Sequence, residues 1–560
     1  MAMQLSVLPE SLAYLWKKTL AEVSHQKIVE RIWNKDYTVW KSTSDEISNR
    51  LGWLQSHEYF KDEWPFVESF VTDVREGGFQ RAILLGMGGS SLAPEIFRRI
   101  LGKREGYLDL TVCDTTAPDT ISFFSRTLDV DKTLFIVSTK SGGTVETLSA
   151  MKYFFQQTCN VTGEIRAGRH FMAITDPGSS LEKEAKKHGF RHIFYGDPDI
   201  GGRYSSLSVF GLVPAALIGA DVKKLVRKVA DDHPNIITLG VKLGCMMGAG
   251  VKTGKNKLTF LLPDSLLPFG DWVEQLIAES TGKEGKGILP VVGEPLGQTG
   301  SYSPDRLFVA IRLQDDPHYD LTCLTGEKHP IAELVLEQIY DLGELLYVWE
   351  IATAVAGHIM GVNPFDQPDV EASKQFTRTV LQKIQDKEAE EDRAPLAHDQ
   401  NMIVYGHGKK GITPEDALAD FLGEIREGSY VAVQVFLAED PVLSELFGKL
   451  RLAIRDRYRV ATTVGYGPRF LHSTGQLHKG DDGSGMFIQF TADHLNDVFI
   501  PDDMTGTTAR LTFGALQNAQ ALGDAKALEA RHRRLLCIHS FTDPRGNIKR
   551  LIDSLCNLAI

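Results

Sequence analysis

The sequence QRAILLGMGGSSLAP, residues 80–94, runs from an apolar strand into a glycine-rich turn that ends in two hydroxyl side chains. A second junction of the same kind follows in LFIVSTKSGGTVETLS, residues 134–149. Small residues after a buried strand let backbone amides approach an anion, and the next helix N-terminus adds about half a positive charge. The two junctions therefore predict a phosphate-binding site. The hydroxyls available to it are those of Ser90, Ser91, Thr139, Ser141, Thr144 and Thr147.

The loop GMGGSS differs from the common nucleotide-binding loops. It lacks the Lys-Ser/Thr ending of a P-loop and the GxGxxG spacing of a dinucleotide fold, which favours a sugar phosphate over a nucleotide. A single glycine-rich turn after a strand is common in α/β proteins and does not by itself indicate a functional site. Two in tandem, both rich in serine and threonine, favour a functional site.

Apolar strands alternate with helix-length segments over residues 81–221, and a second such cycle begins near residue 256. This alternation is typical of parallel βαβ units that are buried on both faces. A long helix is expected over residues 332–360, and a charged linker after about residue 385. The fold class is therefore α/β, with two parallel-sheet domains, a helical N-terminal lead-in and a C-terminal α+β region. The expected boundaries are 1–78, 79–235, 236–385 and 396–560.

The bulk composition restricts the partners. A formal net charge of −12 disfavours nucleic acids and anionic membranes, which both need a basic surface. The six cysteines form no CxxC pair and indicate reduced thiols in a cytoplasmic protein. We find no signal peptide and no run of 18 apolar residues, so we expect no membrane span. A small-molecule ligand fits these properties best.

Three later segments carry side chains suited to catalysis. GGRYSSLSVFGL, residues 201–212, places Arg203 after two glycines, where its planar fork can reach an oxyanion; the alternative is a surface arginine paired with a carboxylate. AESTGKEGKG, residues 278–287, places Glu279 at a helix end, where the dipole increases the proton affinity of a carboxylate; the alternative is an ordinary solvated glutamate. VNPFDQPDVEASK, residues 362–374, is a proline-held turn that aims Gln367 and Lys374 inward.

These motifs together resemble the glucose-6-phosphate isomerase family. The resemblance rests on GMGGSSLAP, STKSGGTVET, GGRYSSLSVFGL, ESTGK and NPFDQPDVEASK, in this order. It covers nearly the whole chain and is closest to the isomerase half of the bifunctional transaldolase/glucose-6-phosphate isomerases, because ATTVGYGPRFLHSTGQLHKG, residues 461–480, is similar to the tail of that half. We see no counterpart of the transaldolase barrel, so the resemblance implies isomerase activity alone.

The resemblance implies two sugar-isomerase (SIS) domains with the active site between them. It implies that Glu279 moves a proton between C1 and C2, that Arg203 lies near the enediolate, and that Gln367 and Lys374 lie near the ring oxygen. No metal or other cofactor is expected, since the chain contains no HExxH, EF-hand or paired Cys/His spacing. The alternative is a non-catalytic SIS protein that senses sugar phosphates. The implied phosphate-site residues are Gly88, Gly89, Ser90, Thr139, Lys140, Ser141, Thr144 and Thr147.

The ring-opening histidine departs from the family pattern. Ordinary members carry it in a GQH context and receive it from the partner subunit of a dimer, but residues 293–308 of this chain contain no histidine. His472 and His478, which flank Thr-Gly-Gln, are the candidates, and we expect the third region to fold over the cleft. The alternative is that both are structural, with His358 and His407 as weaker candidates. A histidine from the same chain would permit a monomer as well as a homodimer.

Overall fold

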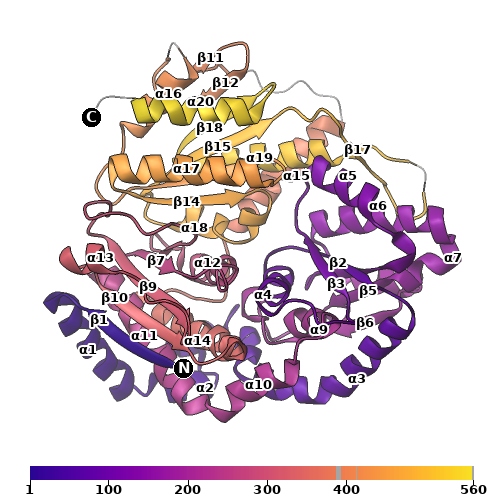
Figure 1. Ribbon diagram of the computed structural model, residues 1–560, viewed down its shortest axis with the longest axis horizontal. Helices are drawn as coiled ribbons and strands as arrows, with labels where there is room; N and C mark the ends of the chain where they lie inside the picture. Colours follow the sequence, from indigo (N-terminus) through magenta and orange to yellow (C-terminus); the bar gives the residue numbers. More distant parts are fainter. Residues whose placement is uncertain (386–392, 412, 507, 558–560) are drawn as a thin grey trace.

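The computed structural model describes residues 1–385, 393–411, 413–506 and 508–557 (Figure 1). Most of the expected charged linker, residues 386–392, lies outside the described residues. The described residues contain three sheets of five or more strands, and a two-stranded ribbon pairs β16 (Phe499–Ile500) with β17 (Leu511–Thr512). The single-turn 3-10 helices are η1 (Tyr37–Val39), η2 (Ser48–Arg50), η3 (Gly52–Gln55), η4 (Gly88–Ser90), η5 (Val130–Lys132), η6 (Gly168–His170), η7 (Gly202–Tyr204), η8 (Ile339–Asp341) and η9 (Arg469–His472).

The first sheet is fully parallel, as the alternating pattern predicted. Its strand order is β3-β2-β4-β5-β6, which places the two glycine-rich junctions after the neighbouring strands β2 and β4. Every residue of β4 is buried, because helices cover both faces of the sheet. The strands are β2 (Arg81–Gly86), β3 (Asp109–Cys113), β4 (Thr133–Ser138), β5 (Phe171–Thr175) and β6 (His192–Tyr195). The helices are α4 (Leu92–Leu101), α5 (Pro118–Thr127), α6 (Val145–Thr162), α7 (Glu164–Ala167), α8 (Ser180–Lys187) and α9 (Val209–Leu217).

The second sheet has the order β1-β10-β9-β7-β8, with β1 antiparallel to β10 and the other pairs parallel. The strands are β1 (Ala2–Val7), β7 (Lys257–Leu261), β8 (Leu289–Val291), β9 (Arg306–Leu313) and β10 (Ile331–Leu336). The helices, with those of the N-terminal lead-in, are α1 (Glu10–His25), α2 (Ile28–Trp33), α3 (Ser56–Glu76), α10 (Val222–Asp231), α11 (His233–Lys252), α12 (Phe269–Thr281), α13 (Thr322–Gly326), α14 (Leu342–Met360) and α15 (Val370–Gln385).

The N-terminal lead-in is mainly helical, as predicted, although one strand, β1, joins the second sheet before the first helix begins. Another expectation about this part of the chain was wrong. The expected helix over residues 332–360 is a strand followed by a helix, β10 and α14. Asp341 accepts hydrogen bonds from the backbone amides of Glu337 and Gln338, and these bonds hold the turn that separates β10 from α14. Pairing of β10 with β9 overrides the helix propensity of its Glu and Leu residues.

The third sheet has the order β11-β12-β18-β15-β13-β14. The region was expected to be α+β, and its sheet is mixed: β13, β14, β15 and β18 are mutually parallel, whereas β11 and β12 pair in antiparallel fashion. The strands are β11 (Ala397–His398), β12 (Met402–Gly406), β13 (Tyr430–Phe436), β14 (Ala461–Tyr466), β15 (Gly485–Ala492) and β18 (Arg534–Ser540). The helices are α16 (Pro414–Leu422), α17 (Pro441–Tyr458), α18 (Gly475–Gly480), α19 (Phe513–Ala530) and α20 (Pro544–Asn557).

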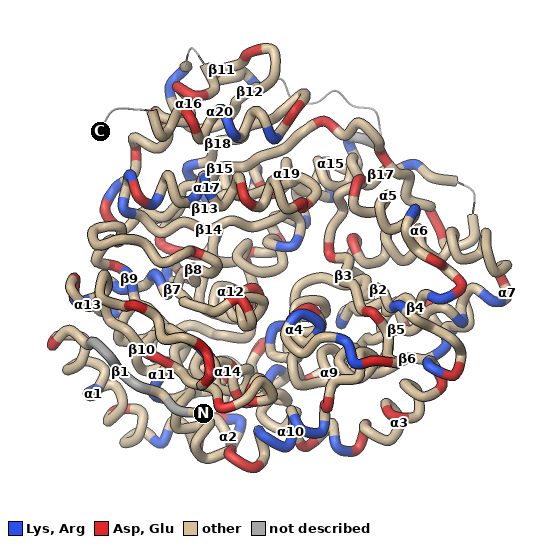
Figure 2. Tube along the Cα trace, in the orientation of Figure 1, with Lys and Arg blue, Asp and Glu red and all other residues tan. Residues whose placement is uncertain are grey.

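The third region bridges the other two. Figure 1 shows it above both lower lobes, with α15 of the second region beside α19. Residues of the ribbon and of α19, Ile500 and Leu516 among them, pack into the core between the first sheet and α6. Figure 2 shows acidic and basic residues interspersed along the chain trace in all three regions.

Helix α11 is long and apolar enough to cross a bilayer, but 61% of its apolar window is buried inside the structure. Its glycines allow close packing on α14: a Cβ on Gly240 would lie 2.7 Å from the Ile351 side chain, and one on Gly244 would lie 2.5 Å from the Ala352 carbonyl oxygen. Burial against another helix is the ordinary situation of a core helix.

A buried ion cluster joins the second and third regions. Glu294 lies 3.3 Å from Arg306 of β9, and 3.9 Å from both Arg451 and Arg455 of α17. The side chains of these residues are at most 6% exposed. A buried cation that loses its partner is strongly destabilising, because the desolvation cost remains.

We therefore expect Glu294→Gln, which removes an anion shared by three buried guanidinium groups, to lower the free energy of unfolding by about 3 kcal/mol. Urea unfolding of the two proteins measures the difference. The control is Glu22→Gln, which breaks an exposed pair with Lys18 and should leave the midpoint unchanged. An unchanged urea midpoint for Glu294→Gln would contradict the stabilising role of this buried ion cluster.

Candidate active site

A cavity of about 680 Å³ lies where the three regions meet. Loops of the first region, helices α12 and α15 of the second, and η9 of the third form its wall. The cavity therefore collects side chains that are distant in sequence. The predicted residues that line it are Gly88, Gly89, Ser90, Thr139, Lys140, Ser141, Thr144, Arg203, Glu279, Gln367, Lys374 and His472.

The first glycine-rich loop needs its glycines for close approach. A Cβ on Gly89 would lie 2.0 Å from the carbonyl oxygen of Gly202, so the loop after β2 and the start of η7 touch through backbone. Gly88 has φ +55°, and a Cβ there would lie 2.8 Å from the Gln275 side-chain amide. A loop without side chains at these two positions leaves its amides open to an anion.

The second loop presents hydroxyls at the start of α6. The Oγ1 atoms of Thr139 and Thr144 are 2.9 Å apart, and the α6 N-terminus follows directly. Ser141 lies between them on the cavity wall. Thr147, by contrast, is buried in α6 and is not among the lining residues, so the structure does not bring it together with the other residues predicted for the phosphate site.

Lys140 lines the cavity but is held by protein groups. Its Nζ lies 2.7 Å from Asp176 and donates to the carbonyl oxygen of Asp197 at 2.8 Å. Burial lowers the pKa of Lys140, and the pairing with Asp176 only partly offsets this effect. Hydroxyls and backbone amides, more than a free ammonium group, therefore define this side of the cavity.

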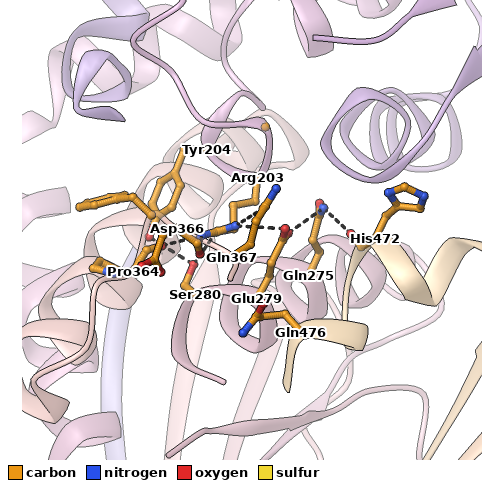
Figure 3. A network of polar contacts seen from close by, with 12 residues as sticks. Arg203, Tyr204, Gln275, Glu279, Ser280, Pro364, Asp366, Gln367, His472 and Gln476 are labelled. Atoms are coloured by element: carbon orange, nitrogen blue, oxygen red, sulfur yellow. Dashed lines mark hydrogen bonds and ion pairs between the residues drawn. The ribbon is translucent and has the colours of Figure 1, made fainter. Parts of the chain in front are cut away.

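Glu279 and Arg203 form a buried ion pair at another part of the cavity wall (Figure 3). Glu279 Oε1 is 3.1 Å from Arg203 Nη1, and both side chains are less than a tenth exposed. Gln275, one helical turn earlier on α12, donates to Glu279 Oε2 at 3.2 Å and to the His472 carbonyl oxygen at 2.7 Å. The carboxylate is thus fixed from two sides. The alternatives of a surface arginine and a solvated glutamate are excluded by this burial.

Arg203 also fixes the proline-held turn before α15. Its Nη1 donates to Gln367 Oε1 at 2.9 Å, and its Nη2 donates to the carbonyl oxygens of Pro364 and Asp366 at 3.0 and 2.7 Å. Its Nε donates to Ser280 Oγ at 2.9 Å. One guanidinium group therefore connects η7, α12 and this turn, which uses the planar fork of donors that lysine lacks.

Lys374 lies on α15 at a more open part of the wall. Its side chain is 44% exposed, and its Nζ is 3.9 Å from Glu371, so this pair is loose. The ammonium group therefore stays accessible from the cavity that it lines.

The two candidate histidines lie in different environments. His472, at the end of η9, lines the cavity, and its Nε2 is 3.0 Å from Glu146 Oε1. His478, on α18, is 2% exposed, packs against Phe487 at 4.9 Å between ring centroids and is not among the lining residues. Burial holds the pKa of His478 well below its usual range. The structure thus places His478 in the core, apart from the predicted catalytic residues that line the cavity.

Glu146 is a cavity residue that the sequence analysis missed. Burial alone would raise its pKa, but the facing His472 and their hydrogen bond outweigh burial and lower it. Gln520 of α19 donates to the same Oε1 at 2.7 Å and accepts from Thr116 at 2.8 Å. Gln275 was missed as well. The sequence held a signal for both residues, because Glu146 lies two residues after the predicted Thr144 and Gln275 lies one helical turn before the predicted Glu279. No local signal pointed to Gln520, which is 374 residues from Glu146.

The largely parallel sheets, with helices between their strands and a cavity where the regions meet, define an α/β protein. A family model described as phosphoglucose isomerase matches residues 69–233, which hold both glycine-rich loops and Arg203. By this match and by the printed names of its relatives, the chain is similar to glucose-6-phosphate isomerases.

Sequence relatives are similar over a little more than half of this chain. A glucose-6-phosphate isomerase of Rubrobacter xylanophilus is 28% identical, covering 54% of this chain and 83% of its own. A glucose-6-phosphate isomerase of Lactobacillus helveticus is 28% identical, covering 60% and 87%. Among solved structures, a glucose-6-phosphate isomerase from Chlamydia trachomatis has a TM-score of 0.56 at 18% identity, covering 68% and 88%. A hypothetical protein, TT0462, from Thermus thermophilus has the same TM-score at 23% identity, covering 68% and 100%. These structures support the fold.

Lys283, in the ESTGK motif, gives a pH-dependent test of how this wall is packed. Its Nζ donates to the carbonyl and carboxylate oxygens of Asp366, and it is 1% exposed. Burial and the nearby Arg203 lower the pKa of Lys283 to about 8, although Asp366 opposes the shift. Between pH 8 and the unfolded value of 10.5, the unfolded chain binds more protons than the folded one. Stability contributed by this group therefore rises with pH across that window.

We expect the free energy of unfolding of the wild type, relative to Lys283→Met, to increase by about 2 kcal/mol between pH 7 and pH 9.5. Methionine does not titrate, so the difference between the two proteins isolates this side chain. Urea unfolding at a series of pH values gives the measurement. A difference that stays constant with pH would show that Lys283 is not buried as described.

Proposed function

We propose that this protein is a glucose-6-phosphate isomerase, which interconverts glucose 6-phosphate and fructose 6-phosphate through a cis-enediolate. The observation that carries the proposal is the shared cavity. The Glu279–Arg203 pair forms one wall and the hydroxyl-lined loops after β2 and β4 form another. A hexose phosphate anchored by its phosphate at the loops would present its first two carbons to the carboxylate.

Ring opening is the first step for a cyclic sugar. It needs a proton delivered to the ring oxygen and one removed from the C1 hydroxyl. Lys374 and His472, which both line the cavity, are suited to these transfers. Glu146 holds the His472 ring in place through the hydrogen bond to Nε2, as a carboxylate does in other acid–base pairs.

Isomerisation of the open chain follows. Glu279 removes the proton from C2, the C–H electrons form the C1–C2 double bond, and the carbonyl oxygen takes negative charge. Arg203 lies beside the carboxylate and stabilises that charge, because a fixed cation in a water-poor site needs no reorganisation. The C2 hydroxyl proton then moves to O1, which transfers the negative charge to O2. Glu279 returns its proton to C1 while the O2 electrons form the C2 carbonyl, and the product is the ketose.

The third region adds features to this proposal. His472 belongs to the same chain as Glu279, which supports a site that is complete without a partner subunit, whether the protein is a monomer or a homodimer. The histidine-bearing segment at residues 461–480 supports a relationship to the isomerase half of the bifunctional enzymes. All six cysteines are free thiols, which fits a cytoplasmic location.

Replacing the base tests the function directly. We expect Glu279→Gln to lower kcat by about 10³-fold or more, because the amide cannot accept the C2 proton, while binding of the acyclic enediolate mimic 5-phosphoarabinonate persists. A coupled assay for glucose 6-phosphate formation and calorimetric titration measure the two quantities.

Glu274→Gln is the matched control on the same helix. Burial and the neighbouring Asp271 raise the pKa of Glu274 to about 8, so its protonated form resembles an amide, and it is not among the lining residues. Its activity should match the wild type. Binding of sugar phosphate without turnover by the wild type would instead support a sensor.

Substitutions of His472 and His478 should have different effects in the same assay. We expect His472→Asn to slow glucose 6-phosphate turnover by about 10²-fold, since ring opening loses its acid–base group. Solvent exchange of the C2 proton of erythrose 4-phosphate, which cannot cyclise, should be spared. His478→Asn should keep the wild-type kcat and lower the melting temperature, because it disturbs the core. Full turnover by His472→Asn would remove this residue from the mechanism.

A further inference from the structure

The short helix η9 connects two different parts of the molecule. Its last residue, His472, lines the substrate cavity, and its first residue, Arg469, lines a separate cavity of about 220 Å³ between β3 and the carboxyl ends of β13 and β14. Two residues, Phe470 and Leu471, separate them. Any force that fixes Arg469 therefore acts on His472 through a single helical turn.

Arg469 is held by a carboxylate of the first region. Its Nε donates to Asp114 Oδ2 at 2.8 Å and its Nη2 donates to Oδ1 at 2.9 Å. Asp114 is 5% exposed and directly follows β3. Such a two-point pair fixes orientation as well as distance, which a single contact does not.

Asp114 also faces the first glycine-rich loop. The Ser91 hydroxyl, next to Ser90, lies 3.5 Å from Asp114 Oδ2 and 3.1 Å from the Gly88 carbonyl oxygen. The carboxylate that holds Arg469 thus belongs to the same sheet edge as the proposed phosphate loops. It relates the position of η9 to the place where the substrate phosphate would sit.

The remaining contacts of η9 hold it from the third region and from α12. Phe470 packs on Phe436 of β13 at 5.4 Å between ring centroids, and the His472 carbonyl oxygen accepts from Gln275. These contacts orient the backbone relative to the second and third regions. The Arg469–Asp114 pair ties that backbone to the first region.

We propose that the Arg469–Asp114 ion pair positions His472 for ring opening. The inference rests on the proposed function. Arg469 and Asp114 are positioning residues, because they act through His472 and lie outside the substrate cavity. Displacement of a catalytic group by about 1 Å can cost about 10²-fold in rate, so loss of the pair should slow the step that uses His472.

The test separates ring opening from binding of an open chain. We expect Arg469→Gln to lower kcat for glucose 6-phosphate at least about tenfold, while the inhibition constant of the acyclic 5-phosphoarabinonate changes less than about twofold. Asp114→Asn should give the same split. The double variant should be no slower than either single variant, because both remove one interaction.

Two controls guard against a merely structural effect. Arg550→Gln removes an arginine that pairs with Asp399 and Glu415 in the third region, remote from the cavity, and should leave kcat unchanged. Melting temperatures of all variants show whether they fold. Arg469→Lys keeps the charge but loses the two-point geometry, so its kcat should lie between those of the wild type and Arg469→Gln. It replaces the glutamine variant in the test if that variant does not fold.

An unchanged kcat in Arg469→Gln and Asp114→Asn would overturn the proposal. So would a parallel loss of turnover and of 5-phosphoarabinonate binding in folded variants, which would indicate general disruption of the site. If the proposed isomerase function itself is wrong, the result is different: the wild type shows no isomerase activity, or Glu279→Gln keeps full activity.

Discussion

The buried guanidinium group of Arg203 is the interaction on which the cavity depends. It pairs with Glu279 on α12, donates to Ser280 on the same helix and holds the turn that carries Gln367. Its own backbone belongs to η7, which touches the first glycine-rich loop through Gly89 and Gly202. A single buried cation thus brings the first and second regions into contact. Its η7 follows β6 at the carboxyl edge of the first sheet, where open α/β sheets bind ligands.

The third region completes the site from another direction. Its η9 places His472 against Glu146 of α6, and its α19 adds Gln520 to the same carboxylate. A buried carboxylate is costly unless it is paired and hydrogen-bonded, so Glu146 requires both contributions. The region is therefore part of the cavity wall as well as a bridge between the two other lobes.

Much of the fold could be predicted because parallel strands that are buried on both faces read as short apolar runs. The sequence also pointed to the glycine-rich loops, Arg203 and Glu279, which line the cavity, because glycines, an arginine and a glutamate are the residue types expected to bind phosphate, bind an oxyanion and transfer a proton. Strand β10 was not, because its Glu and Leu residues favour a helix until β9 pairs with them. His472 and His478 are six residues apart, and only the turn between η9 and α18 decides which one reaches the cavity and which enters the core.

A crystal structure with 5-phosphoarabinonate tests the central claim most directly, namely that Glu279 acts on the first two carbons of a phosphate-anchored open chain. The account predicts the phosphate between the loops at residues 88–90 and 139–144, with the carboxylate of the inhibitor within about 3.2 Å of Glu279 or Arg203. A phosphate bound elsewhere, or an inhibitor carboxylate out of reach of both side chains, would contradict it.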